Sequence, residues 1–304
     1  MIRVRAAAAR NTRSVVWEKA SKAVSVIRKV KSVIDPRPIT EGAGVKLKRT
    51  IGTRALDYLD PFLLLDHFES QNESDYTAGF PLHPHRGIET VTYLLKGEVR
   101  HKDTLGSAGK IGAGDVQWMT AGRGILHEEM PQARPEGIQG FQLWVNLPAK
   151  LKMTQPHYQE FSVGRIPQVT RKDGSVIRII TGETDGVKGP VTGIAADPIY
   201  LDVSMPVHTT FTQSIERGHH AFVYVFEGEA AFGESASISY PALVVLDDGD
   251  AVQVVTQAKP VRFLLVSGKP LGEPVVRHGT FVMNTKEEID QALHELKMGT
   301  FIAR

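Results

Sequence analysis

Two pairs of metal-binding side chains, within residues 80–130, restrict this chain more than any other feature of its sequence. The first pair is carried by His83-Pro84-His85 and the second by His127-Glu128-Glu129. Side chains at positions i and i+2 of a β-strand point to the same side, so each pair can direct both of its donor groups at one point. The sequence therefore predicts two strands that together present three imidazoles and one carboxylate.

The residues between the two pairs allow the chain to fold back on itself. An apolar, β-branched run at 89–95 is followed by a turn at Lys96-Gly97, a polar strand, and a glycine-rich turn at 112–114. This pattern predicts antiparallel strands joined by tight turns, which would bring the two halves of the site together. Imidazole with carboxylate suits iron, zinc, copper, nickel or manganese, and the lack of thiolates argues against a purely structural zinc site.

The residues alone leave the fourth ligand open. Glu129 shares a predicted strand with His127, whereas Glu89 has the same strand parity as the first histidine pair. We expect Glu129 to be the ligand and keep Glu89 as the alternative. Three other polar residues of this stretch have the wrong parity or lie at a turn, and we interpret them as solvated or as groups that support the ligands. They are Arg86, His101 and Glu128.

The two donor pairs lie within the long motifs HPHRGIETVTYLLKGEVRHKDTLG and GDVQWMTAGRGILHEEMP. Two further motifs are FQLWVNLP downstream and GTRALDYLDPFLLLDHF upstream. They resemble the pirin family of the cupin superfamily, and the resemblance covers nearly the whole chain apart from its N-terminal extension. Matching the family's iron ligands by position gives His83, His85, His127 and Glu129. The resemblance thus favours Glu129 over Glu89 and implies Fe²⁺, although other divalent transition metals suit the same donors.

Composition excludes several classes of protein. The chain has 304 residues, of which 41% are hydrophobic and 23% charged, as in a soluble globular protein with one large or two ordinary domains. Its net charge of +2 gives no overall attraction to nucleic acid. The absence of cysteine fits a reducing compartment, and we expect a cytoplasmic protein. No apolar run is long enough to span a membrane.

Residues 1–34 differ from the rest of the chain. Lysine and arginine far outnumber acidic residues there, and apolar residues recur near helical spacing. Organellar transit peptides have this composition, and so do segments that bind anionic surfaces. We prefer a basic N-terminal extension that is partly helical and partly disordered. Asp35-Pro36-Arg37-Pro38 blocks helix continuation and marks the expected start of the folded part.

The second half of the chain repeats the strand pattern of the first. Glu227-Gly228-Glu229 echoes Lys96-Gly97-Glu98, and Gly249-Asp250 echoes Gly114-Asp115. The positions equivalent to the four ligands carry no imidazole, so we expect this half to be metal-free: they are Ser214, Glu216, Arg262 and Leu264. Strands are expected at Val45–Arg49, Phe62–Phe68, Phe141–Leu147, Val176–Thr181, Ile199–Val203, Ala221–Phe226, Leu243–Leu246 and Val261–Val266.

These observations predict an all-β protein of two tandem barrels, which the resemblance identifies as cupin barrels (double-stranded β-helices). A short C-terminal helix is expected after Thr285, which begins a capping-box motif. The predicted divisions are 1–34 for the extension, 35–165 for a metal-binding barrel and 166–304 for a metal-free barrel. Barrels of this size can hold a small ligand. If one face of 141–147 lines the cavity, Gln142 and Asn146 can bind a ligand by hydrogen bonds while Trp144 stacks on it.

The resemblance implies an activity like that of quercetin 2,3-dioxygenase, in which a flavonol reacts with O₂ and carbon monoxide is released. Glu129 would then also act as the general base for the 3-hydroxyl proton. The alternative that the family implies is an iron-dependent regulatory protein that contacts a transcription factor or a metabolic enzyme. The chain carries no DNA-binding motif, so we expect protein contact rather than direct nucleic-acid binding. A third hypothesis is a barrel that the metal only stabilises.

Overall fold

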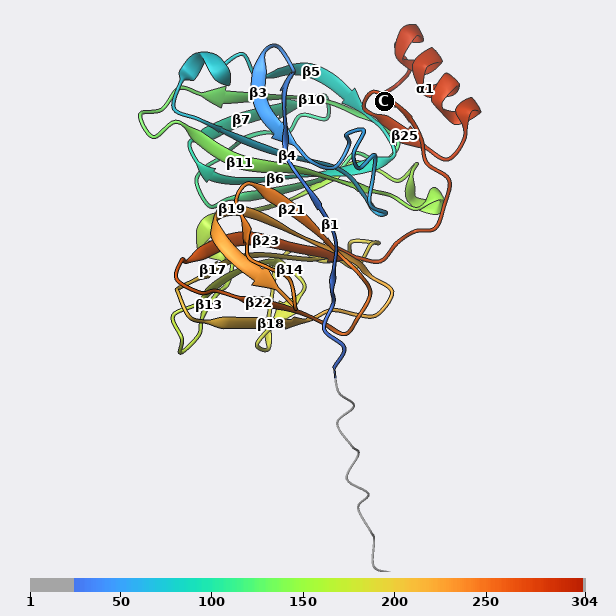
Figure 1. The fold of residues 1–304 in the computed structure, drawn as a ribbon. Helices are drawn as coiled ribbons and strands as arrows, with labels where there is room; N and C mark the ends of the chain where they lie inside the picture. The colour runs from blue at the N-terminus through green and yellow to red at the C-terminus, as the bar shows by residue number, and fades with distance from the viewer. Residues whose placement is uncertain (1–24, 303–304) are drawn as a thin grey trace, which may run out of the picture.

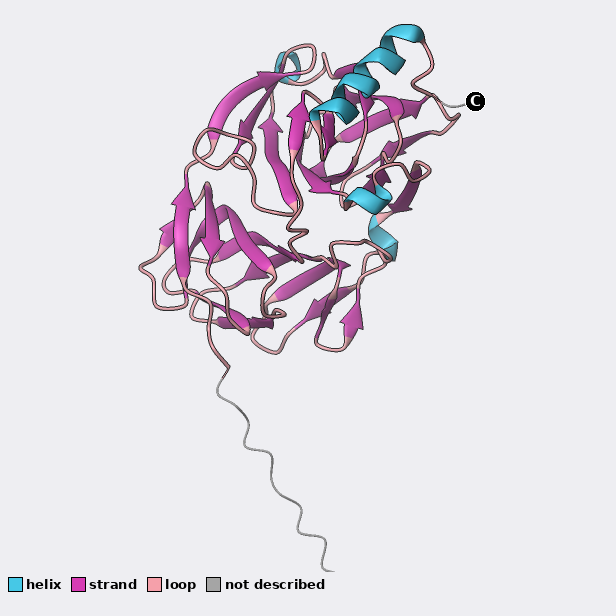
Figure 2. Cartoon of the chain, turned by 90° about the vertical axis from the view of Figure 1, so that its right-hand side faces the viewer, coloured by secondary structure: helices cyan, strands magenta, loops and turns pink. Residues whose placement is uncertain are grey.

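The computed structural model describes residues 25–302, and these form two β-barrels packed against each other. In Figure 1 the first barrel, coloured blue to green, lies above the second, coloured yellow to orange. Strands dominate both barrels in Figure 2, and the principal helix lies beside the first barrel. The all-β architecture of two tandem barrels expected from the sequence is thereby confirmed.

The first barrel consists of two sheets. The seven-stranded sheet has the order β12 (His157–Phe161), β9 (Val116–Thr120), β6 (Ile88–Lys96), β11 (Ile138–Asn146), β4 (Phe62–Ser70), β3 (Val45–Arg49) and β2 (Arg37–Glu41). The four-stranded sheet has the order β5 (Phe80–His85), β10 (Ile125–Gln132), β7 (Glu98–Asp103) and β8 (Ala108–Ile111). Pairing within both sheets is antiparallel, as expected for strands joined by tight turns.

The second barrel is one ten-stranded sheet that curves back on itself. Its main path is β1 (Val30–Ile34), β21 (Ala242–Leu246), β19 (His220–Phe232), β23 (Val261–Gly268), β17 (Ile199–Met205), β14 (Val176–Thr181) and β13 (Gln168–Thr170). Off this path, β22 (Ala251–Val255) pairs with β19 and with β18 (Thr210–Ser214), and β20 (Ile238–Ser239) pairs with β19. Two short hairpins are β15 (Glu183–Thr184) with β16 (Val187–Lys188), and β24 (Val276–His278) with β25 (Phe281–Met283).

The two barrels share a hydrophobic core. Alternate residues of β6 and β11, such as Val91 and Phe141, point out of the first barrel and pack against β19 and β23 of the second. Tyr93 crosses the same interface, where its hydroxyl donates a 2.6 Å hydrogen bond to Asp202. His67 lies there too, stacked on Phe141 with ring centroids 4.8 Å apart. The other residues of β6 and β11 face into the first barrel and are therefore available to line a cavity.

The ends of the chain cross over between the barrels. Strand β1 pairs with β21 of the second barrel, and the buried Arg28 side chain donates hydrogen bonds to the carbonyl oxygens of Glu216 and His219. We had expected residues up to 34 to be an extension, but 30–34 form a sheet strand because the β21 edge supplies backbone partners. Residues 1–24, which carry the rest of that expectation, lie outside the described part.

The C-terminal segment, which the predicted division places with the second barrel, contacts the first barrel. Within β25, the backbone N–H of Val282 donates a hydrogen bond to the carbonyl oxygen of Arg86 in the first barrel. Gly87, with φ +79°, allows this approach, since a Cβ there would lie 2.0 Å from the Val282 carbonyl oxygen. Helix α1 (Lys286–Met298) has the expected capping box at Thr285 and ends at Gly299. No described helix has both the length and the apolar character needed to cross a bilayer.

Candidate metal centre

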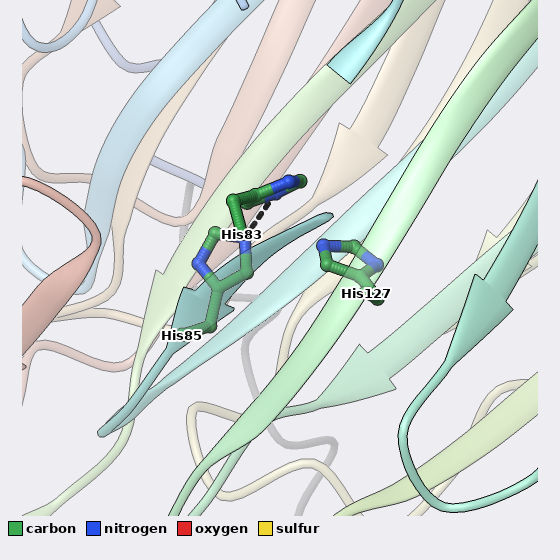
Figure 3. Close-up of side chains that lie close together, drawn as sticks. All are labelled: His83, His85 and His127. Carbon is green, nitrogen blue, oxygen red and sulfur yellow. Dashed lines mark hydrogen bonds between the residues drawn. The ribbon is translucent and has the colours of Figure 1, made fainter. Parts of the chain in front are cut away.

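Three imidazoles converge inside the first barrel. Strands β5 and β10 are antiparallel neighbours, and His83 is directly opposite His127 in their register. His85 lies two residues along β5 on the same face. The ring centroids of His83 and His127 are 4.5 Å apart, and each of the three histidines offers a nitrogen within 4.8 Å of the others. Figure 3 shows the three rings facing a common point. The structure thus brings together the three histidines expected from the sequence.

The tautomer of His83 follows from its hydrogen bonds. Its Nδ1 lies 2.9 Å from the carbonyl oxygen of Pro81, which can only accept, so Nδ1 carries the proton. Its Nε2 then presents a lone pair, and this atom is 3.0 Å from Nε2 of His85. A ligating histidine normally donates its other N–H to a carbonyl or carboxylate in this way. His83 is therefore oriented as a metal ligand by its own strand.

His85 and His127 are held as neutral imidazoles. Burial lowers the pKa of His127 to about 3, with further lowering by the neighbouring His83. Burial, then the proximity of His127 and His83, places the pKa of His85 well below its usual value. Neutral imidazole is the form that binds metal ions. Both ring nitrogens of His127 and Nδ1 of His85 have no hydrogen-bond partner among residues 25–302, and such buried orphans are costly unless a ligand satisfies them.

These features fit a divalent metal ion. Two imidazole nitrogens bound to one ion at about 2.1 Å cannot be more than about 4.2 Å apart, and the 3.0 Å between His83 and His85 Nε2 lies within that limit. The only direct interaction that these two nitrogens can form with each other is one N–H···N hydrogen bond. The donor set contains no sulfur, which suits iron, manganese, nickel, copper or zinc. His83 and His85 therefore have the spacing of two ligands of one metal ion, and the nearby His127 nitrogen completes a candidate metal site.

Glu129 faces the same cavity but is not part of the histidine group. Its Oε1 accepts a hydrogen bond from Thr92 at 3.0 Å, and its Oε2 accepts one from Gln142 at 3.2 Å. Burial raises the pKa of this carboxyl, while nearby His83 opposes the rise. The group of mutually close ligand atoms contains His83, His85 and His127 alone. Glu129 as fourth ligand therefore stays a prediction, with its carboxylate aligned by two hydrogen bonds.

Glu89, the alternative fourth ligand, is directed away from the cavity. Its carboxylate accepts a 2.8 Å hydrogen bond from Thr120 on β9. The turn at Arg86-Gly87 separates β5 from β6, so the parity count from His85 does not continue through it. On β6 the cavity-facing residue is Thr92, and Glu89 differs from it in parity.

A cavity of about 460 Å³ opens beside the histidines. Its wall is mostly apolar, and the metal-site residues His83, His85 and Glu129 lie on one part of it. The first barrel and the C-terminal segment contribute to the wall, with residues that include Val45, Leu47, Leu64, Phe68, Phe80, Val99, Ile138, Trp144 and Arg277. This volume is in the range that encloses a drug-sized ligand. A site for an aromatic molecule next to the metal is therefore available.

One of the two predicted amides lines this cavity. Gln142 and Trp144 are on its wall, and the Trp144 ring meets the His85 ring edge to face, with centroids 5.2 Å apart. Asn146 lies further along β11, where its Oδ1 accepts a 2.8 Å hydrogen bond from Lys152. We had expected Asn146 to be available to a ligand, but the Lys152 ammonium occupies it. Trp118 is buried in the shared core and has only a packing role.

The three polar residues that the sequence analysis excluded as ligands differ in burial: Arg86 and His101 are buried, and Glu128 is partly buried. Arg86 is buried rather than solvated: it donates a 2.6 Å hydrogen bond to Glu295 of α1, and its guanidinium lies 4.4 Å from the Phe301 ring centroid. His101 is also buried, opposite Glu129 in the pairing of β7 with β10, with Nε2 3.1 Å from a carboxylate oxygen of Glu160. Glu128 is partly buried and pairs with Lys102 on β7.

The second barrel holds no comparable cluster. Within residues 25–302, the only group of three or more potential ligands is the one in the first barrel. His219 and His220 are adjacent on the chain, and Nδ1 of His220 lies 2.6 Å from the carbonyl oxygen of Asp60. They face different surroundings, as expected for neighbours on a strand.

Sequence analysis missed several residues of the cavity. Thr92, which holds Glu129, is recognisable only once the parity of β6 is known. Arg277 and Thr280 come from the C-terminal segment, and Thr280 Oγ1 donates a hydrogen bond to the carbonyl of Pro84, between the two β5 histidines. No sequence pattern links positions so distant along the chain.

Comparison with known proteins identifies the family. The family model described as Pirin matches residues 44–145, and the model described as Pirin C-terminal cupin domain matches residues 200–302. The chain belongs to the pirin family. The resemblance found in the sequence motifs is thus confirmed, and the histidine cluster of this pirin lies in the matched N-terminal domain.

The similarity between this pirin and its relatives extends over nearly the whole length of each relative. A pirin-like protein of Caulobacter vibrioides is 45% identical over 278 residues, covering 90% of this chain and 99% of the relative. A putative quercetin 2,3-dioxygenase of Pseudomonas aeruginosa is 41% identical, covering 86% and 94%. The crystal structure of a quercetin 2,3-dioxygenase from Acinetobacter baumannii matches with a TM-score of 0.83 and 34% identity, covering 91% of this chain and 99% of that one.

Proposed function

We propose that this pirin is a metal-dependent dioxygenase of the quercetin 2,3-dioxygenase type, which opens flavonols with O₂ and releases carbon monoxide. The observation that carries the proposal is the opening of the three-histidine cluster into an apolar cavity that has an indole ring on its wall. Two relatives named above bear the name of this activity, one of them as a putative assignment. A flavonol offers the flat aromatic body and the oxygen donors that such a cavity accepts.

The bound ion is proposed to be Fe²⁺, held by His83, His85, His127 and Glu129. It would act as a Lewis acid that lowers the pKa of a bound flavonol hydroxyl. His85 and His127 would supply neutral nitrogens, and the Glu129 carboxylate in its ionised form would supply a negative charge. The cavity leaves room beside them for the substrate.

The protein's own residues perform the remaining tasks. Glu129 is proposed to accept the proton of the 3-hydroxyl, because its carboxylate faces the cavity and burial raises its pKa toward that of a useful base. Thr92 and Gln142 fix the direction of both its oxygens. Trp144 provides a flat surface for the ring system, and the apolar wall excludes water from the reacting end.

Aerobic flavonol decay tests this proposal. Quercetin absorbance should fall when metal-loaded protein is added and should stay constant with metal-stripped protein, with carbon monoxide formed in step with the loss. His83→Ala should abolish turnover while circular dichroism shows an unchanged fold. Retained turnover in that variant would rule out the histidine cluster as the site. A metal-loaded protein inert toward every flavonol would favour the regulatory alternative, in which the protein acts through a protein partner in the cytoplasm.

A further inference from the structure

The cavity contains a guanidinium without a carboxylate partner. Among the described residues, two guanidinium side chains line it, Arg49 and Arg277. Arg49 is paired with two carboxylates: its Nε and Nη2 each donate a 2.7 Å hydrogen bond to Asp66, and its Nη1 donates one of 2.9 Å to Glu41. Within residues 25–302, Arg277 forms no ion pair. The two arginines therefore differ in what they can offer a ligand.

Arg277 is held in place by contacts that leave part of its guanidinium available. Its Nε donates a 3.1 Å hydrogen bond to the carbonyl of Gly279, and its Nη1 reaches the carbonyl of Leu63 only at 3.5 Å. The guanidinium carbon lies 4.9 Å from the centroid of the Trp144 ring. Stacking on an aromatic face leaves the N–H groups at the edge of a guanidinium free to bind an anion. Nη2 has no partner among the described residues.

Charges of both signs surround Arg277, and a second guanidinium lies among them. Burial and the nearby Arg49 lower the pKa of Arg277, because a second positive charge is unfavourable in a partly desolvated wall. Asp57, Asp66 and Glu41 oppose this effect without pairing with it. A bound negative group would relieve the repulsion, and charge-assisted hydrogen bonds of this kind are the strong ones. Arg277 is an exposed residue at the edge of the cavity, so a ligand can reach it.

The position of Arg277 relates it to the metal centre. Trp144 contacts the guanidinium and also the His85 ring, so one indole connects the two. The segment that carries Arg277 is fixed to the first barrel through the bond from Thr280 to Pro84 and the bond from Val282 to Arg86. Arg277 is thus preorganised next to the site rather than attached to a loose tail.

We propose that Arg277 is a specificity residue that binds an anionic oxygen, a carboxylate or phenolate, on an aromatic ligand whose other end reaches the metal. This deepens the proposed function, on which it rests for the metal-bound end of the ligand. Such a ligand stacks along Trp144 with its negative group at the guanidinium edge. The preferred substrates are then aromatic acids and acidic phenols rather than neutral aromatics.

The test compares two ligands of nearly equal size. They are 3-hydroxyflavone with a carboxylate at its 4′ position and the methyl ester of that compound, and they share the end that would bind the metal. Binding to the metal-loaded protein is measured by calorimetry without O₂, so that no turnover occurs. We expect the acid to bind at least about tenfold more tightly than the ester, the gain typical of one charge-assisted contact.

Variants separate this role from a structural one. Arg277→Met keeps an apolar chain on Trp144, and we expect it to bring the two affinities within about twofold without changing the affinity for the ester or the metal content. Arg277→Lys should keep part of the preference, and Lys172→Met, an exposed cation of the second barrel, should keep all of it. An unchanged preference in Arg277→Met, or equal binding of acid and ester by the wild type, overturns this inference alone. Failure of both flavones to bind overturns the proposed function as well.

Discussion

Nε2 of His83 and Nε2 of His85 lie 3.0 Å apart and face each other across the position proposed for the metal. The hydrogen bond from His83 Nδ1 to the Pro81 carbonyl determines which of its nitrogens bears a lone pair. Two residues on one strand therefore provide half of the site before the rest of the barrel is considered. The predictions below test what depends on this arrangement.

Metal content is the first measurable consequence. We expect about one ion per chain in the wild type, because within residues 25–302 only the first barrel gathers three imidazoles, and less than about a tenth of that in His83→Ala. Elemental analysis of purified protein gives both values. His220→Ala, an exposed histidine outside the cluster, should retain the full content. Near two ions per chain, or an undiminished content in His83→Ala, would contradict the assignment.

The Glu129→Gln variant tests whether Glu129 acts as a metal ligand and general base or only lies near the site. The amide keeps the size of the side chain but cannot accept the proton, so turnover of flavonols should fall by roughly 10²- to 10⁴-fold. Steady-state rates at saturating metal measure the loss. Glu128→Gln alters the adjacent residue, whose side chain points the other way on β10, and should leave the rate unchanged. A Glu129→Gln enzyme with full activity would remove this residue from the mechanism.

Stability should depend on pH through Glu89. Burial raises its pKa to about 7 from 4.5, so the folded state binds this proton more tightly than the unfolded chain does. Its stabilising contribution is complete below the unfolded pKa and is lost as the pH rises through the folded pKa. Glu89→Gln cannot ionise, and relative to wild type it should gain up to about 3 kcal/mol at about pH 8.

Urea denaturation of both proteins at about pH 8 and about pH 4.5 measures this difference. We expect most of the gain to disappear at the lower pH, where the wild-type carboxyl is protonated in the folded state and about half protonated in the unfolded state. Glu136→Gln, at an exposed position, serves as the control and should change stability little at either pH. A gain of equal size at both values would mean that ionisation of Glu89 has no part in it.

Lys152 fastens the C-terminal segment to the first barrel. Its buried ammonium donates to three acceptors, Gly87 O at 2.9 Å, Asn146 Oδ1 at 2.8 Å and Val282 O at 2.8 Å, so each of its protons has a partner. Lys152→Met leaves all three acceptors unpaired, and we expect a loss of roughly 3 kcal/mol in the free energy of unfolding.

Thermal or urea unfolding measures that loss, and hydrogen exchange in residues 276–302 should become faster, since the segment loses an anchor. Lys150→Met changes an exposed lysine two residues away and should affect neither quantity. Exchange that accelerates equally throughout the protein would show a general destabilisation rather than release of this segment.

Predictions from the sequence were correct where the residues concerned lie on one strand, and they failed where a turn or a distant segment intervenes. Period-two spacing placed His83 with His85 and predicted His127 beside them, because alternation along one strand is a local rule. The same rule failed for Glu89, since the turn at Gly87 interrupts the strand and the parity count begins again. The helical spacing noted in residues 1–34 did not anticipate β1, where pairing with β21 overrides local preference.

By itself the sequence determined the strand pattern, the two-barrel family and the three histidines that gather, because strand period, turn chemistry and the long motifs are all encoded over short distances. Only the tertiary structure decided which residues complete the cavity. Arg277 reaches Trp144 because the C-terminal segment packs on the first barrel, and Asn146 is withheld from a ligand because Lys152 binds it. Those contacts join positions far apart on the chain or on separate elements, and their formation depends on how the completed barrels pack.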